Sequence, residues 1–186
     1  MNMRVFISYR RAEDNKSYIV GTIHEEDGNV FGKENVFRDI YDIAGGASWR
    51  EVLDRETNSC KVMLVVIGPD WASLAHPNGE KRLFDPADVT RWEVETGLRR
   101  SQEEGITLIP VLVTGARLPR AEELPEPLQP LLEKNVITLR NYPDLDTDIE
   151  KLIHDIRRSR GYGEEDLSLE YFEPKTIYIA KGSFTM

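Results

Sequence analysis

Apolar residues gather in short runs along the chain, and longer stretches of mixed polar and apolar residues separate them. The runs cover residues 5–7, 35–37, 62–67, 107–113 and 136–139. The third and fourth runs are continuously apolar, which is typical of strands covered on both faces in a parallel sheet. The intervening segments are long enough for crossover helices. The pattern therefore predicts five strands joined by helices.

Helical spacing of apolar residues marks the segments between the runs. It predicts helices over residues 13–26, 48–57, 85–104 and 145–156. Asp85 followed by Pro86 is typical of a helix N-terminus, so we expect the third helix to begin there. Four prolines between residues 119 and 130 predict a loop with at most a short helix before the fifth strand. The order of elements predicts a doubly wound α/β domain that ends near Ser159.

Length and charge narrow the class of protein. A chain of 186 residues with 40% hydrophobic residues is long enough for one globular domain with a sizeable core. The net charge of −9 disfavours nucleic acid and anionic lipid as partners, because no long-range positive field attracts them. The apolar runs are too short for a membrane span, and no signal peptide is recognisable. We therefore expect a cytoplasmic protein without membrane contact.

Cysteine and histidine content excludes several kinds of site. The single cysteine, Cys60, cannot form an intrachain disulfide or a CxxC metal site, and it fits the reducing cytosol. The three histidines lack zinc-ligand spacing, so we expect no metal, and no GxSxG turn is present. Neither GxGxxG nor GxxxxGK[ST] occurs, which excludes a Rossmann fingerprint and a P-loop.

Polar residues follow the predicted strands, where ligands bind in open α/β sheets. They include Ser8 to Arg11 after the first strand, Arg38 and Asp39 after the second, and Gly68 to Trp71 after the third. Guanidinium, carboxylate and indole groups suit a ligand with phosphates and flat rings. The alternative is that these residues are polar because surface loops are polar in general.

Several motifs together resemble the bacterial type of Toll/interleukin-1 receptor (TIR) domain. They are VFISYRR at residues 5–11, VFRD at 36–39 with GGASW at 45–49, VMLVVIGPDW at 62–71, WEVE at 92–95 and LIPV at 108–111. The resemblance implies a TIR domain over residues 3–159 with a flavodoxin-like, doubly wound, five-stranded parallel sheet flanked by helices. Residues 160–171 would then form a linker.

The resemblance implies one of two functions. Many TIR domains cleave the nicotinamide–ribose bond of NAD+ and release ADP-ribose or a cyclic isomer, in bacterial defence or signalling, when they self-associate. Other TIR domains are non-catalytic adaptors that act by self-association alone. In the enzymes NAD+ is the substrate and no further cofactor takes part.

The implied catalytic residue is Glu93, on the helix after the third strand. The implied substrate-binding residues are Ser8, Arg10, Arg11, Asp39, Trp49 and Trp71. Arg11 and the backbone after Ser8 would meet phosphates, Asp39 a ribose hydroxyl, and Trp49 a ring. Enzymatic members often carry tryptophan four residues before the glutamate, whereas this chain has Val89 there and Trp92 beside Glu93. Glu95 is a rival carboxylate that lies roughly 200° away around the helix.

We also make predictions for one loop within the TIR-like region and for the last fifteen residues of the chain. The loop from Asp39 to Ser48 has two glycines and three large apolar residues, so we expect it to fold over the cleft or to dock on a neighbouring molecule. Residues 172–186 resemble the opening of a formylglycine-generating-enzyme-like (sulfatase-modifying factor) domain. That resemblance implies a second domain beginning after the linker.

Overall fold

The computed structural model describes residues 3–10, 17–38, 48–113 and 115–162 of the chain. Their strands form one parallel sheet in the order β2-β1-β3-β4-β5. The strands are β1 (Val5–Tyr9), β2 (Val36–Arg38), β3 (Val62–Ile67), β4 (Thr107–Val113) and β5 (Ile137–Leu139). This is the strand order of flavodoxin-like folds, so the predicted fold class is confirmed.

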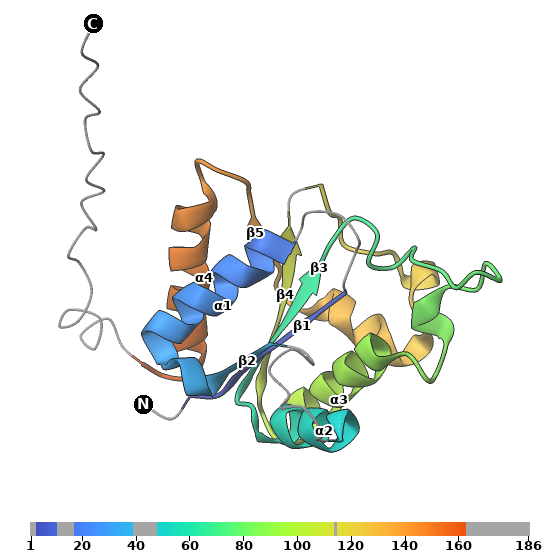
Figure 1. Cartoon of the computed structure of the whole chain (residues 1–186), viewed down its shortest axis with the longest axis horizontal. Coiled ribbons are helices and arrows are strands. Elements are labelled where there is room, and N and C mark those ends of the chain that lie inside the picture. Colours follow the sequence, from blue (N-terminus) through green and yellow to red (C-terminus); the bar gives the residue numbers. More distant parts are fainter. Residues whose placement is uncertain (1–2, 11–16, 39–47, 114, 163–186) are drawn as a thin grey trace, which may run out of the picture.

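Helices cover both faces of the sheet. They are α1 (Ser17–Phe31), α2 (Trp49–Ser59), α3 (Val89–Glu103) and α4 (Leu145–Ser159). Figure 1 shows α1 and α4 on one side of the sheet and α2 and α3 on the other. Among the described residues, no helix is long and apolar enough to cross a membrane.

Successive side chains of each strand point to opposite faces of the sheet and so divide the core into two layers. Val5 and Ile7 of β1 pack toward α1 and α4, whereas Phe6 packs with residues of α2 and α3. The same alternation runs through β3, whose six residues are all buried. Burial on both faces explains why this strand is continuously apolar.

The third helix begins later than predicted. Asp85 accepts a hydrogen bond from the Ala87 backbone N–H through Oδ1 (2.8 Å) and so forms a turn before the helix. Asp88 is the N-cap of α3, and its Oδ1 accepts from the Arg91 backbone N–H at 2.9 Å. The Asp-Pro pair at residues 85 and 86 therefore belongs to the turn, because the next aspartate is better placed to cap the helix.

Glycine and proline residues explain the end of α1 and the connection before β5. The helix α1 extends beyond the predicted residue 26 to Phe31, whose ring is buried in the core. It stops at Gly32, which has a φ of 92° and whose N–H closes onto the Gly28 carbonyl. The proline-rich connection before β5 carries only the 3-10 segments Ala121–Glu123 and Glu126–Glu133, as predicted.

Candidate functional site

The end of β1 meets the side of α3 in a buried contact between Ser8 and Glu93. The Ser8 hydroxyl donates to Glu93 Oε2 at 2.6 Å. Ser8 follows Phe6 by two residues, so it faces the α2 and α3 side of the sheet. Glu93 is only 5% exposed. A short hydrogen bond to a buried carboxylate fixes the position of that carboxylate.

Arg10 forms a second connection between β1 and α3. Its Nη1 and Nη2 donate to the Oδ2 and Oδ1 of Asp88 at 3.1 and 2.8 Å. The side chain of Arg10 is 5% exposed and that of Asp88 is 1% exposed. We call this bidentate pair the Arg10–Asp88 clamp. It joins the segment after β1 to the first turn of α3.

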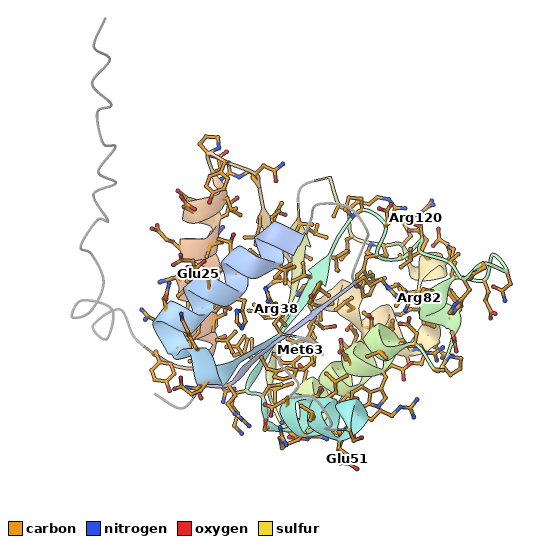
Figure 2. The ribbon with its side chains drawn as sticks, in the orientation of Figure 1. Glu25, Arg38, Glu51, Met63, Arg82 and Arg120 are labelled. Carbon is orange, nitrogen blue, oxygen red and sulfur yellow. The ribbon has the colours of Figure 1, made fainter. Side chains whose placement is uncertain are left out.

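Arg82 adds a second positive charge to Asp88. Its Nε lies 3.3 Å from Asp88 Oδ2, and its side chain is 41% exposed. Figure 2 shows Arg82 near the N-terminal end of α3. Asp88 thus faces two guanidinium groups and one backbone N–H.

Electrostatic interactions connect the clamp with Glu93. Burial lowers the pKa of the Arg10 guanidinium, while Asp88 opposes this shift through its hydrogen bonds and its charge. The charge of Glu93 also raises the pKa of Arg10, although less strongly than Asp88 does. Arg10 is therefore attracted to both carboxylates and is hydrogen-bonded to Asp88.

Glu95 lies on a different side of α3 from Glu93, as the helical geometry predicts. It accepts a hydrogen bond from Arg91 Nε at 2.7 Å, and its side chain is 33% exposed. Only Glu93 of the two carboxylates is buried against β1.

Trp71 lies in the core and not on a surface that can receive a ligand. It is 2% exposed and belongs to the apolar layer between the sheet and α3. An indole after a strand packs into this layer because it contributes a large apolar area. Trp71 is thus buried in this structure, and its expected role in substrate binding stays a prediction.

Other predicted residues lie outside the described part of the chain. These are Arg11, Asp39, and the rest of the loop up to residue 47. Trp49 is the first residue of α2, but its side chain is likewise not described. The structure thus brings together Ser8, Arg10 and Glu93 of the predicted set.

A groove between α2 and α3 lies on the same side of the sheet. It has a volume of about 660 Å³ and is lined by Arg50, Glu51, Leu53, Asp54, Pro86, Ala87, Val89 and Trp92. We call it the α2–α3 groove. Figure 2 shows Glu51, one of the lining residues, on α2. Its size is within the range of small-molecule sites.

Asp88 is the residue of the site that sequence reasoning missed. Its position one residue before an apolar helical pattern is a signal for an N-cap. No local signal indicates its pairing with Arg10, which is 78 positions away. Among the described residues, no cluster of three or more His, Cys, Asp or Glu side chains is arranged to hold a metal ion.

Comparison with known proteins identifies the family. The family model described as TIR domain matches residues 5–153, so the chain belongs to the TIR domain family. No curated protein sequence matches the chain.

Solved structures provide further likenesses. The TIR domains of the activated Roq1 resistosome, which directly recognizes the pathogen effector XopQ, share 17% identity with a TM-score of 0.63, over 83% of this chain and 99% of theirs. A TIR-STING receptor from C. gigas in complex with 2',3'-cGAMP shares 20% identity with a TM-score of 0.48, over 78% of this chain and 38% of its own. A prokaryotic SEFIR domain shares 16% identity with a TM-score of 0.48, over 83% of this chain and 98% of its own. The Roq1 likeness shows the fold.

Proposed function

We propose that this TIR domain cleaves the bond between nicotinamide and ribose in NAD+, with Glu93 as the catalytic carboxylate. The observation that carries the proposal is the buried Ser8–Glu93 hydrogen bond of 2.6 Å at the carboxyl end of β1. Ligands of open α/β sheets bind at that end of the strands. The products are nicotinamide and ADP-ribose or a cyclic ADP-ribose isomer.

One carboxylate is chemically sufficient for this reaction. The nicotinamide ring of NAD+ is cationic, so it leaves as a neutral molecule when it takes the electron pair of the C–N bond. The ribose is left as an oxocarbenium ion, which a nearby anion stabilises by charge. Water then bonds to the ribose carbon and releases a proton to solvent. In cyclisation a ring nitrogen of the adenine bonds to this carbon instead, and the positive charge passes to the adenine.

The surroundings of Glu93 support this role. Ser8 holds the Glu93 carboxylate in one orientation by a hydrogen bond. The α2–α3 groove, which Val89 and Trp92 of the same helix line, provides an apolar wall of suitable size for part of a dinucleotide. We assign Ser8 as a positioning residue and keep Arg11, Asp39 and Trp49 as proposed substrate contacts.

Nicotinamide release from NAD+ tests the proposal. The purified chain, at high protein concentration, is expected to release nicotinamide that chromatography detects. Glu93→Gln removes the negative charge with little change of shape, so we expect kcat to fall at least about a hundredfold. Equal rates for the wild type and Glu93→Gln would remove Glu93 from the mechanism.

Glu95→Gln is the matched control. It makes the same substitution on the same helix, but at a half-exposed carboxylate paired with Arg91. We expect this variant to keep the wild-type rate. A loss as large as that of Glu93→Gln would show that the charge of α3 as a whole matters, and not the carboxylate at β1.

A second candidate function is that of a non-catalytic adaptor that self-associates. The low exposure of Glu93 favours it, because a substrate must displace neighbouring atoms to reach the carboxylate. Val89, at the position where enzymatic TIR domains often have tryptophan, favours it too. The Roq1 protein carries its TIR domains in a resistosome, and we propose by analogy that this chain also assembles. Concentration-dependent oligomers without any NAD+ cleavage would support this function.

We propose that the protein acts in the cytoplasm, in bacterial defence or signalling. We also propose that the TIR domain spans residues 3–159, with a linker at 160–171 before the segment 172–186 that resembles the opening of a sulfatase-modifying factor domain. The family match ends at residue 153, and residues from 163 onward lie outside the described part.

A further inference from the structure

Asp88 connects the segment after β1 with the N-terminus of α3. Its two oxygens accept from Nη1 and Nη2 of Arg10, and Oδ1 also accepts from the Arg91 backbone N–H. Its side chain has almost no exposed surface. A buried carboxylate with so many charge-assisted bonds holds its partners in one arrangement.

Arg10 has a second carboxylate within its electrostatic reach. Ser8 and Arg10 leave the same strand end two positions apart, and Ser8 is bonded to Glu93. The charge of Glu93 acts on the Arg10 guanidinium as an attraction. Asp88 and Glu93 therefore compete for one buried cation, and the hydrogen bonds show that Asp88 holds it.

We propose that Asp88 is a positioning residue that holds the Arg10 guanidinium in the clamp and thereby keeps it from pairing with Glu93. This inference rests on the proposed NAD+ cleavage and deepens it. A guanidinium bonded to Glu93 would neutralise the charge that stabilises the oxocarbenium ion. The clamp keeps the Arg10 guanidinium near both buried carboxylates, whose negative charges it balances. It also keeps this guanidinium from direct contact with Glu93.

The substitution Asp88→Asn isolates this role. Asparagine caps a helix as well as aspartate, so the first turn of α3 is retained. It does not offer a negative charge, so the buried Arg10 guanidinium turns to Glu93. We expect kcat for NAD+ cleavage to fall about a hundredfold with KM nearly unchanged.

Removing the Arg10 cation then distinguishes a positioning role of Asp88 from a structural defect of the Asp88→Asn variant. In the double variant Arg10→Met/Asp88→Asn the Arg10 guanidinium cannot neutralise Glu93, so we expect most of the lost kcat to return. Asp85→Asn is the matched control, because Asp85 lies in the preceding turn and bonds to Ala87 and His76, whereas Arg10 bonds to Asp88. We expect this control to keep the wild-type rate. All rates are measured below the lowest thermal midpoint of the set, so that unfolded protein does not lower kcat.

A crystal structure of the Asp88→Asn variant tests the inference without an activity measurement, because it shows where the Arg10 guanidinium lies. We expect the Arg10 guanidinium within hydrogen-bond distance of the Glu93 carboxylate. A guanidinium that stays beside residue 88, or a double variant no more active than Asp88→Asn, overturns the inference. If the wild type does not cleave NAD+, the proposed function fails, while the position of Arg10 in the Asp88→Asn crystal structure still decides whether Asp88 holds it.

Discussion

At the scale of single residues, Asp27 is a carboxylic acid within an apolar face. It lies four residues after Ile23 and four before Phe31 on the buried side of α1, and it has no exposed surface. Within the described residues, neither of its carboxyl oxygens has a hydrogen-bond partner. Burial raises the pKa of Asp27 to about 8, and the neighbouring Glu26 adds to the shift. Asp27 is therefore largely protonated at neutral pH.

The raised pKa of Asp27 predicts a pH dependence of stability. In the unfolded chain an aspartate titrates near ~3.9, so between that pH and about 8 the folded state holds a proton that the unfolded state has released. The contribution of Asp27 to the free energy of unfolding thus falls as pH rises through this window, by about 1.4 kcal/mol per pH unit. Asp27→Asn removes this dependence. Urea unfolding at about pH 5 and about pH 8 should show a smaller difference for the variant than for the wild type.

Glu25→Gln is the control for this prediction. Glu25 is an exposed carboxylate of the same helix, so its substitution should leave the pH dependence of the wild type unchanged. If Asp27→Asn and the wild type lose stability in parallel as pH rises, Asp27 is ionised in the folded protein and the prediction is wrong.

At the scale of elements, the close approach of α3 to the sheet depends on Gly97. This residue lies one turn after Glu93, on the same side of the helix. A Cβ at Gly97 would collide with the Met63 sulfur of β3 and lie 3.1 Å from Leu108 Cδ1 of β4. Glycine therefore lets the helix backbone rest on the strands, which brings Glu93 within reach of Ser8.

Gly97→Ala is expected to destabilise the protein, although alanine is the better helix former. The gain in helix propensity is about 1 kcal/mol, whereas overpacking a filled core costs roughly 1–3 kcal/mol. We expect a net loss of about 1 kcal/mol in the free energy of unfolding, together with a fall in the rate of NAD+ cleavage, because α3 moves away from β1. Urea unfolding and nicotinamide release measure the two effects.

A second substitution checks the reason for this loss. Met63→Ala makes room opposite Gly97, so adding Gly97→Ala to that variant should cost less than adding it to the wild type. Equal costs in the two backgrounds would show that contact with Met63 is not the cause.

At the scale of the whole molecule, net charge opposes the proposed self-association. The chain carries a net charge of −9, so copies repel one another at low ionic strength. Salt at about 0.15 M shortens the range of this repulsion to about 8 Å. We expect light scattering to show larger oligomers at this salt concentration than at low salt, and the specific rate of NAD+ cleavage to rise with protein concentration. A specific rate that is independent of protein concentration would show that a single copy is active.

The sequence by itself determined the elements of this protein and their order. The continuous apolar runs of β3 and β4 and the apolar stripe of α4 are local patterns, and the structure contains these elements where the patterns predict them. Buried strands and amphipathic helices form where apolar residues are spaced so that they can avoid water, and this spacing can be read from neighbouring residues in the sequence. For the same reason the strand-end position of Ser8 and the helical position of Glu93 were predictable.

Only the tertiary structure decided which of these residues meet. Ser8 and Glu93 are 85 positions apart, and Arg10 and Asp88 are 78 apart. Their contacts depend on the pairing of β1 with β3 and on how closely α3 packs against these strands, which no local pattern contains. The burial of Trp71 is likewise a property of the tertiary structure, because a residue that follows a strand can face either solvent or the neighbouring helix. The sequence thus specifies which groups are available, and packing over long sequence distances decides which of them share a site.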